Sequence, residues 1–311
     1  MTRLDMRAAA RRLAVLLLLL LPGMLVAPAA AHAGPTSVSI VNSASFAGSP
    51  LARGALLTAF GSGGSFLLPG SPSQSYSFPS WPTNAGGVQV YINNCTLSTG
   101  KYLPILYVSP TQINFYLPNS FDPAREVFGT CAGSTPGTSF TSTFTITSQD
   151  GTTASTTLTT TTFRPGVFFE PGTNKAQGLH YDAWTGALTD LRSCNGSNCP
   201  VYGEYAPTSN RIAVLTTGGE GASCGGPRAA CTNGFFSGVG FRLGGSQQRL
   251  LYHGPPGDNP YSYLNPPGTT LGQDVAIIDI TLGTAGTYTL QMTYNGAVTG
   301  NTTNVVLGPP N

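Results

Sequence analysis

Side chains able to do acid–base chemistry are scarce in this chain of 311 residues, of which 8% are charged and three are histidines. One histidine belongs to an N-terminal leader described below. The other two, His180 and His253, lie in separate segments that alternate apolar and polar residues, a pattern typical of strands with one buried face. We therefore interpret both as strand residues with a satisfied hydrogen bond rather than as catalytic bases.

One pattern matches a known nucleophile motif. Residues Gly221 to Gly225 read G-x-S-x-G, which places Ser223 where hydrolases carry their nucleophile. That motif needs a helix after the serine, whereas Gly225-Gly226-Pro227 disfavours one. Paired carboxylates for glycoside hydrolysis are the other route to hydrolysis, and the candidate acids are Glu170, Glu204 and Glu220. A secreted hydrolase with its site in the C-terminal half is thus the alternative, while we expect no catalytic residues.

The segment from Asp182 to Asp190 contains several aspartate and threonine side chains whose oxygen atoms could bind a cation. An Asp-x-x-Thr-Gly segment between apolar runs is, however, ordinary hairpin chemistry, because aspartate and glycine both favour tight turns. The sequence contains no phosphate-binding glycine loop and no dinucleotide fingerprint. We therefore expect neither a metal site nor a cofactor.

The number of cysteines is even, as expected if all of them form disulfides in an exported protein. The six are Cys95, Cys131, Cys194, Cys199, Cys224 and Cys231. If no bridge crosses the two halves of the chain, Cys95 pairs with Cys131. The other four allow three connectivities, of which we favour Cys194 with Cys199, and hence Cys224 with Cys231, because both spacings close short loops. A zinc site is the competing interpretation, but the spacing contains no CxxC pair and the expected compartment is oxidising.

The first 33 residues have the three parts of a secretory signal. Four arginines precede an apolar run from Leu13 to Leu21, and Ala31-His32-Ala33 predicts cleavage before Gly34. The run is shorter than the roughly 20 residues of a membrane span, so we expect an extracellular, periplasmic or cell-surface protein without a transmembrane span. Ten basic and eleven acidic residues then remain, a net charge of −1. This balance argues against a nucleic-acid partner, which requires a basic surface.

An internal repeat is the most informative feature of the remaining chain. Four blocks recur in the same order, and the first is identical at five of nine positions. The matched blocks are Arg53 to Gly61 with Arg211 to Gly219, Gly87 to Ile92 with Gly238 to Leu243, Ile105-Leu106-Tyr107 with Leu250-Leu251-Tyr252, and Thr143 to Ile146 with Thr287 to Leu290. Preserved order predicts an internal duplication.

Each half contains about seven short segments that alternate apolar and polar residues between turn residues. Such a series is typical of a β-sandwich of the immunoglobulin type. The sequence therefore predicts an all-β protein with two tandem immunoglobulin-like sandwich domains, 34–163 and 164–311, joined by a hinge at Phe163 to Gly166.

Two loops rich in aromatic residues are the candidate binding segments, since loops on such scaffolds bind ligands and exposed rings stack on sugars or anchor proteins. They run from Ser73 to Asn84 and from Pro255 to Thr270. Their aromatic residues are Tyr76, Phe78 and Trp81 in the first and Tyr261 and Tyr263 in the second. The alternative is that these rings fold back over the sandwich ends as part of the core.

The chain also resembles a known family, the uncharacterised C-terminal domain of exported proteins from Solibacter and other Acidobacteria. The motifs that carry the resemblance are Val41-Asn42-Ser43-Ala44-Ser45-Phe46, Ala59-Phe60-Gly61, Gly87-Val88-Gln89-Val90, the block from Tyr107 to Pro118, and Pro165-Gly166-Val167-Phe168. The region from Pro255 to Asp274 departs from the pattern as an apparent insertion. The resemblance implies a tandem immunoglobulin-like exported module without an assigned activity.

These observations favour a non-catalytic exported protein that serves adhesion, surface association or recognition of a polysaccharide or protein partner at the cell surface. The rivals are the secreted hydrolase and a purely structural spacer.

Overall fold

The computed structural model describes residues 33–77, 80–94, 100–118, 139–161, 164–182, 186–194, 210–218, 239–254, 259, 261–266, 273–280 and 284–308. Within these ranges the chain is all-β, with two short 3₁₀ turns, η2 (Leu191–Ser193) and η5 (Ser262–Leu264), as its other regular elements. The 40 glycines and 25 prolines of the sequence account for this, since both residue types interrupt helices. The expected all-β fold is confirmed. None of the described residues forms a helix that could cross a membrane.

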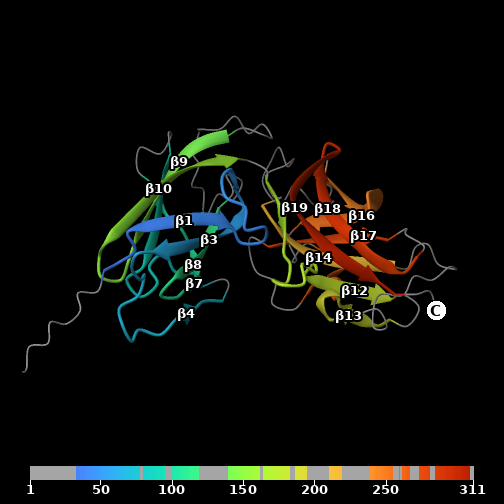
Figure 1. Cartoon of the computed structure of the whole chain (residues 1–311), viewed down its shortest axis with the longest axis horizontal. Coiled ribbons are helices and arrows are strands. Elements are labelled where there is room, and N and C mark those ends of the chain that lie inside the picture. The colour runs from blue at the N-terminus through green and yellow to red at the C-terminus, as the bar shows by residue number, and fades with distance from the viewer. Residues whose placement is uncertain are drawn as a thin grey trace, which may run out of the picture.

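Two five-stranded sheets make up the first half of the chain (Figure 1). The first has the order β1 (Ser37–Asn42), β3 (Ala55–Ser62), β8 (Gln112–Leu117), β7 (Ile105–Val108) and β4 (Gln74–Ser75). The second has the order β2 (Leu51–Ala52), β10 (Thr153–Thr161), β9 (Ser139–Thr147), β5 (Gln89–Asn94) and β6 (Lys101–Tyr102). Alternate residues of both sheets, such as Leu57, Phe115 and Phe144, meet in one buried core. The period-2 pattern of the sequence therefore marks the inward faces.

A longer strand path forms the second half. Its order is β13 (Leu188–Asp190), β12 (Gly178–Asp182), β14 (Asn210–Thr217), β17 (Asp274–Asp279), β16 (Ser246–Gly254), β15 (Val239–Leu243), β18 (Gly286–Tyr294) and β19 (Ala297–Leu307), and β11 (Gly166–Val167) also pairs with β14. Strand β16 joins two layers, because its start pairs with β15 and its end with β17. Ile212, Phe241 and Leu290 meet in the core between the layers.

The same strand neighbours recur in both halves. Strand β8 lies between β3 and β7 as β17 lies between β14 and β16, and β9 lies between β10 and β5 as β18 lies between β19 and β15. A shift of register interrupts the pairing between Ile105 and Tyr107 and again between Leu250 and Tyr252. These two irregularities fall in the third pair of matched sequence blocks.

The first pair of matched blocks does not correspond in space. Sequence identity aligns Ala55 with Ala213, but Ala55 faces the core between the sheets whereas Ala213 belongs to a cluster on the opposite face of its sheet. A one-residue slip exchanges the two faces of a strand. The alignment that gives five identical residues in nine is therefore shifted by one residue from the correspondence of inward faces in the structure.

The two halves pack against each other, and Asn42, Phe46 and Gly166 of the motifs described above lie at this contact. The backbone N–H of Leu56 donates to Thr217 Oγ1 at 2.8 Å, and the rings of Phe46 and Phe169 meet edge to face at 6.0 Å. Gly166 lies so close to the first half that a Cβ atom there would be 2.7 Å from Oδ1 of Asn42. Only glycine permits this approach.

The expected cleavage before Gly34 places a new charge against the first half. The Gly34 nitrogen donates to Asp150 Oδ2 at 3.0 Å. After cleavage this nitrogen is an ammonium group at neutral pH, since α-amino groups titrate near pH 8. We expect Asp150→Asn to lower the free energy of unfolding of the mature chain by about 1 kcal/mol, the upper value for an exposed ion pair.

Urea unfolding of the mature chain, and of a form that keeps an extension before Gly34, checks this expectation. In the extended form the same nitrogen is a neutral amide, so the loss from Asp150→Asn should be smaller. Equal losses in both forms would show that the ammonium group contributes nothing.

Candidate functional site

Five side chains form a continuous row on the outer face of the second half. Directly opposite residues on neighbouring strands are Arg249 with Asp279, Asp279 with Arg211, Arg211 with Tyr181, and Tyr181 with Leu188. Opposite residues in antiparallel strands project to the same face. With neighbouring strands 4.7–4.9 Å apart, this arginine–tyrosine row is about 19 Å long.

The turn η5 adds two more aromatic rings beside the row. Arg211 Nη1 donates to the Tyr263 hydroxyl at 3.2 Å, and its guanidinium carbon lies 5.0 Å from the centre of the Tyr261 ring. The Tyr263 ring also contacts Tyr181 edge to face, with 5.0 Å between centroids. Arg211 therefore holds both tyrosines through a hydrogen bond and a cation–π contact.

Local hydrogen bonds fix the turn that carries these tyrosines. Asn259 Oδ1 accepts from the Tyr261 N–H at 2.8 Å, and Asn259 Nδ2 donates to Asn265 Oδ1 at 2.7 Å. Leu264 is fully buried against the outer face of the sheet, in a cluster with Tyr252 and Ile277. Tyr261 is partly buried there, whereas 47% of Tyr263 is exposed.

Charge in the row is carried by two arginines around one carboxylate. The Asp279 side chain is 6% exposed, and Oδ1 accepts from Arg211 Nε at 3.3 Å. Arg249 reaches Oδ2 only at 3.8 Å and leaves 70% of its side chain in solvent. Burial lowers the pKa of Arg211, but the hydrogen bond to Tyr263 and the charge of Asp279 outweigh it and raise that pKa above its usual value. Two guanidinium groups and one carboxylate give the row a formal net charge of +1.

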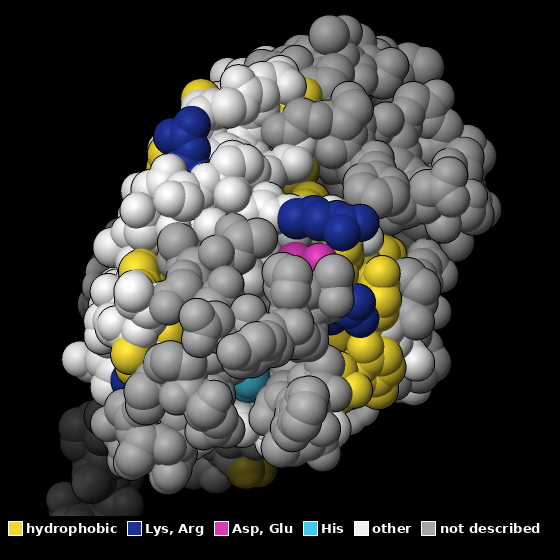
Figure 2. Space-filling model, turned by 90° about the vertical axis from the view of Figure 1, so that its right-hand side faces the viewer, with side chains coloured by type: hydrophobic (Ala, Val, Ile, Leu, Met, Phe, Trp, Pro, Cys, Tyr) yellow, Lys and Arg dark blue, Asp and Glu magenta, His cyan; other side chains and the backbone are white. Residues whose placement is uncertain are grey.

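Hydrophobic side chains are also exposed on this face. Leu188, at the end of the row, is 49% exposed and lies opposite Tyr181 on the neighbouring strand. Tyr263 contacts the ring of the same Tyr181. Figure 2 shows one side of the second half, where a Lys or Arg side chain lies next to acidic side-chain atoms and hydrophobic side chains gather beside them. An apolar surface with a few fixed polar groups is typical of a binding site.

The first aromatic loop lies differently from the second. Trp81 is 7% exposed and packs with Leu56 and Tyr116, its ring 6.1 Å from that of Tyr116. Tyr76 is partly buried against the same cluster, and Phe168 from the second half joins it. Phe78 lies outside the described residues. The structure thus separates the two loops, with Trp81 under the contact between the halves and Tyr263 in solvent.

Both histidines are buried strand residues. His253 Nε2 lies 3.0 Å from Thr216 Oγ1, inside the core of the second half beside the ring of Phe241. Burial lowers the pKa of His253 to about 3, so the ring is neutral at physiological pH. His180 is also buried, on β12. His180 is next to Tyr181 on β12 and therefore projects to the opposite face of the sheet.

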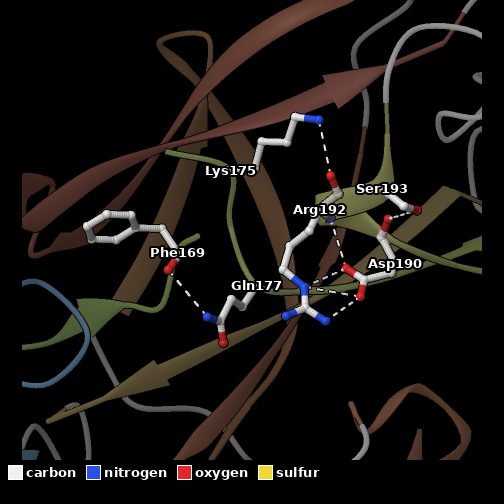
Figure 3. A network of polar contacts seen from close by, with 6 residues as sticks. All are labelled: Phe169, Lys175, Gln177, Asp190, Arg192 and Ser193. Atoms are coloured by element: carbon white, nitrogen blue, oxygen red, sulfur yellow. Dashed lines mark hydrogen bonds and ion pairs between the residues drawn. The ribbon is translucent and has the colours of Figure 1, made fainter. Parts of the chain in front are cut away.

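Glu170 and Asp190, two acidic residues of the second half, are bound within local turns. Glu170 accepts from Thr173 Oγ1 at 2.7 Å within a turn. The segment from Asp182 to Asp190 connects the antiparallel strands β12 and β13, and Asp190 binds Arg192 through both carboxylate oxygens (Figure 3). Its hydrogen bond to Arg192 lowers the pKa of Asp190. In the described ranges, histidine, cysteine and acidic side chains form no group of three that could hold a metal ion.

Other predicted residues cannot be placed. Ser223, Glu204, Glu220 and the signal segment 1–32 lie outside the described residues, as do Cys95, Cys131, Cys199, Cys224 and Cys231. Cys194 is buried after η2, and Lys175 Nζ donates to its carbonyl oxygen. The disulfide pairing stays a prediction.

Sequence reasoning anticipated Tyr261 and Tyr263 but missed the rest of the site. Tyr181, Leu188, Arg211, Arg249 and Asp279 come from five strands. Their alternation with core residues was visible, and it marks them as outward-facing. The strand order that aligns them has no local signal.

Comparisons with known proteins place no family on the chain. A scan of protein-family models and a search of curated proteins found no match. Among solved structures, the Bacteroides ovatus mixed-linkage glucan utilization locus protein SGBP-B, in complex with a heptasaccharide, is 10% identical, with a TM-score of 0.25 over 90% of this chain. The chain spans 64% of that protein.

Two further structures are as distant. Domains 4–9 of the surface layer protein SbsC are 12% identical (TM-score 0.20, 88% of this chain and 31% of that one). The fibronectin(III)-like modules of Clostridium thermocellum CbhA are 11% identical (TM-score 0.18, 88% and 94%). Scores this low establish no shared function.

Proposed function

We propose that this protein is a non-catalytic, exported recognition protein that binds its partner through the arginine–tyrosine row and Tyr263. The observation that carries the proposal is the state of Tyr263, whose ring is 47% exposed yet held by Arg211 and Tyr181. A tyrosine fixed before binding loses little conformational entropy when a ligand covers it. Its fixed position distinguishes Tyr263 from exposed side chains that have no contacts to hold them in one conformation.

A purely structural spacer is supported less well by the same geometry. A spacer needs a rigid contact between its halves, which Trp81 and Gly166 supply. It does not need an exposed tyrosine clamped to an arginine. Of the residues that a secreted hydrolase could use, Glu170 accepts a hydrogen bond from Thr173 within its own turn. Ser223, Glu204 and Glu220 lie outside the described residues.

We further propose that the two halves are immunoglobulin-like domains, 34–163 and 164–311, descended from one duplicated unit and exported to the cell surface or beyond. Supporting this are the recurring strand neighbours and the register shifts at Ile105 and Leu250. Membership of the exported Solibacter family is supported by structural roles for its motif residues. Asn42 Oδ1 accepts from the N–H groups of Ala44 and Ser45, and Ser109 Oγ accepts from that of Gln112.

Replacing Tyr263 with alanine tests the binding proposal. We expect about a tenfold or greater loss of affinity for cell-envelope polysaccharide or protein fractions, since a central aromatic contact is worth more than about 1 kcal/mol. Binding is measured by co-sedimentation of the mature chain with each fraction.

Tyr102→Ala is the matched control. Tyr102 is 50% exposed and also contacts a second tyrosine edge to face, Tyr91, at 5.2 Å, but it lies in the first half. We expect its removal to leave binding unchanged. Equal effects of the two substitutions, or none from Tyr263→Ala, would contradict the assignment of the site.

A further inference from the structure

We propose that the ligand of the arginine–tyrosine row is an acidic polysaccharide, whose sugar carboxylates bind Arg249 and Arg211 while a sugar ring stacks on Tyr263. This inference rests on the proposed function and names its ligand class. It follows from the charge, the hydrogen-bonding capacity and the length of the row.

The charge of the row favours an anion. Two guanidinium groups share the single carboxylate of Asp279, and that carboxylate is almost withdrawn from solvent, at 6% exposure. An approaching ligand therefore meets the arginines before it meets the aspartate. The row thus combines two cationic groups with one shielded carboxylate, in a mature chain whose expected net charge is −1.

The two arginines differ in how they can serve a ligand. Arg211 is fixed, because it donates to both Asp279 and Tyr263. Arg249 touches Asp279 only at 3.8 Å, beyond hydrogen-bonding distance, and is 70% exposed. A contact this long, made by an arginine that is mostly in solvent, contributes little, so Arg249 can turn to a ligand carboxylate at small cost. Guanidinium groups bind carboxylates in a planar, two-bond geometry.

The exposed ring of Tyr263 and the length of the arginine–tyrosine row favour a sugar chain over a small anion as the ligand. The faces of pyranose rings are apolar and pack on aromatic rings, and Tyr263 offers such a ring within the reach of Arg211. The row continues about 19 Å from Arg249 to Leu188, which is longer than a single sugar. A repeating polymer can therefore contact a cation and an aromatic ring at once.

The experiment compares the affinity of the protein for one polysaccharide in a charged and an uncharged form. Polygalacturonate and its fully methyl-esterified form have the same sugar chain, but the ester has no free carboxylate. We expect the mature chain to bind polygalacturonate, or alginate as a second polyuronate, at least about tenfold more tightly than the ester. Raising the ionic strength from about 0.05 to about 0.5 M should weaken the binding of the polyuronates, because exposed charges are screened.

Arg249→Gln tests the residue assignment, and Lys101→Gln is its control. Lys101 is an exposed cation on β6, in the first half. We expect Arg249→Gln to lower polyuronate affinity several-fold and Lys101→Gln to leave it unchanged. Tyr263→Ala should lower the affinity for either polymer by about tenfold or more.

Each contrary outcome has its own meaning. Equal binding of polyuronate and ester, both weakened in Tyr263→Ala, would overturn the acidic ligand and leave the recognition function standing. Binding to neither polyuronate, or equally tight binding of poly-glutamate, would also overturn this inference, while envelope fractions still test the recognition function. No dependence on Tyr263 with any ligand would overturn both.

Discussion

Replacing Trp81 with alanine is expected to lower the free energy of unfolding by about 3–5 kcal/mol, the usual range for removal of a buried large aromatic side chain. The indole is 7% exposed and fills the space between Leu56, Tyr116 and the partly buried Phe168 of the second half. Its loss leaves a cavity at the contact between the halves, where backbone hydrogen bonds from Ile105 to Pro82 and from Phe168 to Leu215 hold the neighbouring segments. This tryptophan is thus a stability residue, although its loop composition suggested binding.

Urea unfolding followed by circular dichroism measures this change. Tyr102→Ala, at an exposed ring, should cost less than about 1 kcal/mol. Under conditions where Trp81→Ala remains folded, its ligand affinity should equal that of the unsubstituted protein, because Trp81 and the arginine–tyrosine row lie in different halves. A stable Trp81→Ala variant that fails to bind would reverse the roles assigned to the two aromatic loops.

Acid should destabilise the protein through His253. Its folded pKa is lowered to about 3 from the ordinary 6.5, since the ring is buried. Between these two values the unfolded chain binds a proton that the folded chain excludes, so the stabilisation present above pH 6.5 is lost as the pH falls. The loss is about 1.4 kcal/mol per pH unit, or about 2 kcal/mol between pH 6.5 and pH 5.

His253→Gln isolates this effect from other titrating groups. Glutamine can still bond Thr216, which lies 3.0 Å from His253 Nε2, but it does not titrate. We expect the stability difference between the two proteins to change by about 2 kcal/mol between pH 7 and pH 5, with His253→Gln the less sensitive. Parallel stability profiles over this range would show that His253 takes up its proton in the folded state.

Local patterns in the sequence predicted much of the fold. Alternation of apolar and polar residues located the strands. Asn295 and Gly296, which both have positive φ, form the hairpin turn between β18 and β19, as this dipeptide favours. The alternation also separates inward residues such as Leu57 from outward ones such as Thr58. The alignment of the internal repeat failed for the block from Arg53 to Gly61, where residue identity matched opposite faces of β3 and β14.

The candidate site shows what local patterns lack. Tyr261 and Tyr263 were predicted from one loop, but the row that gives them a charged partner is assembled from strands β12, β13, β14, β16 and β17. Strand order depends on which inward faces pack best, a property of the whole half.

The sequence by itself determined the strand content, the turns and the two aromatic loops, because each depends on the conformational preferences of neighbouring residues. Only the tertiary structure decided that Trp81 is covered and Tyr263 exposed. The two rings differ in what lies over them: the second half packs over the first loop, while η5 buries Leu264 and leaves Tyr263 above the sheet. Burial is set by distant segments, so no window of local sequence contains it.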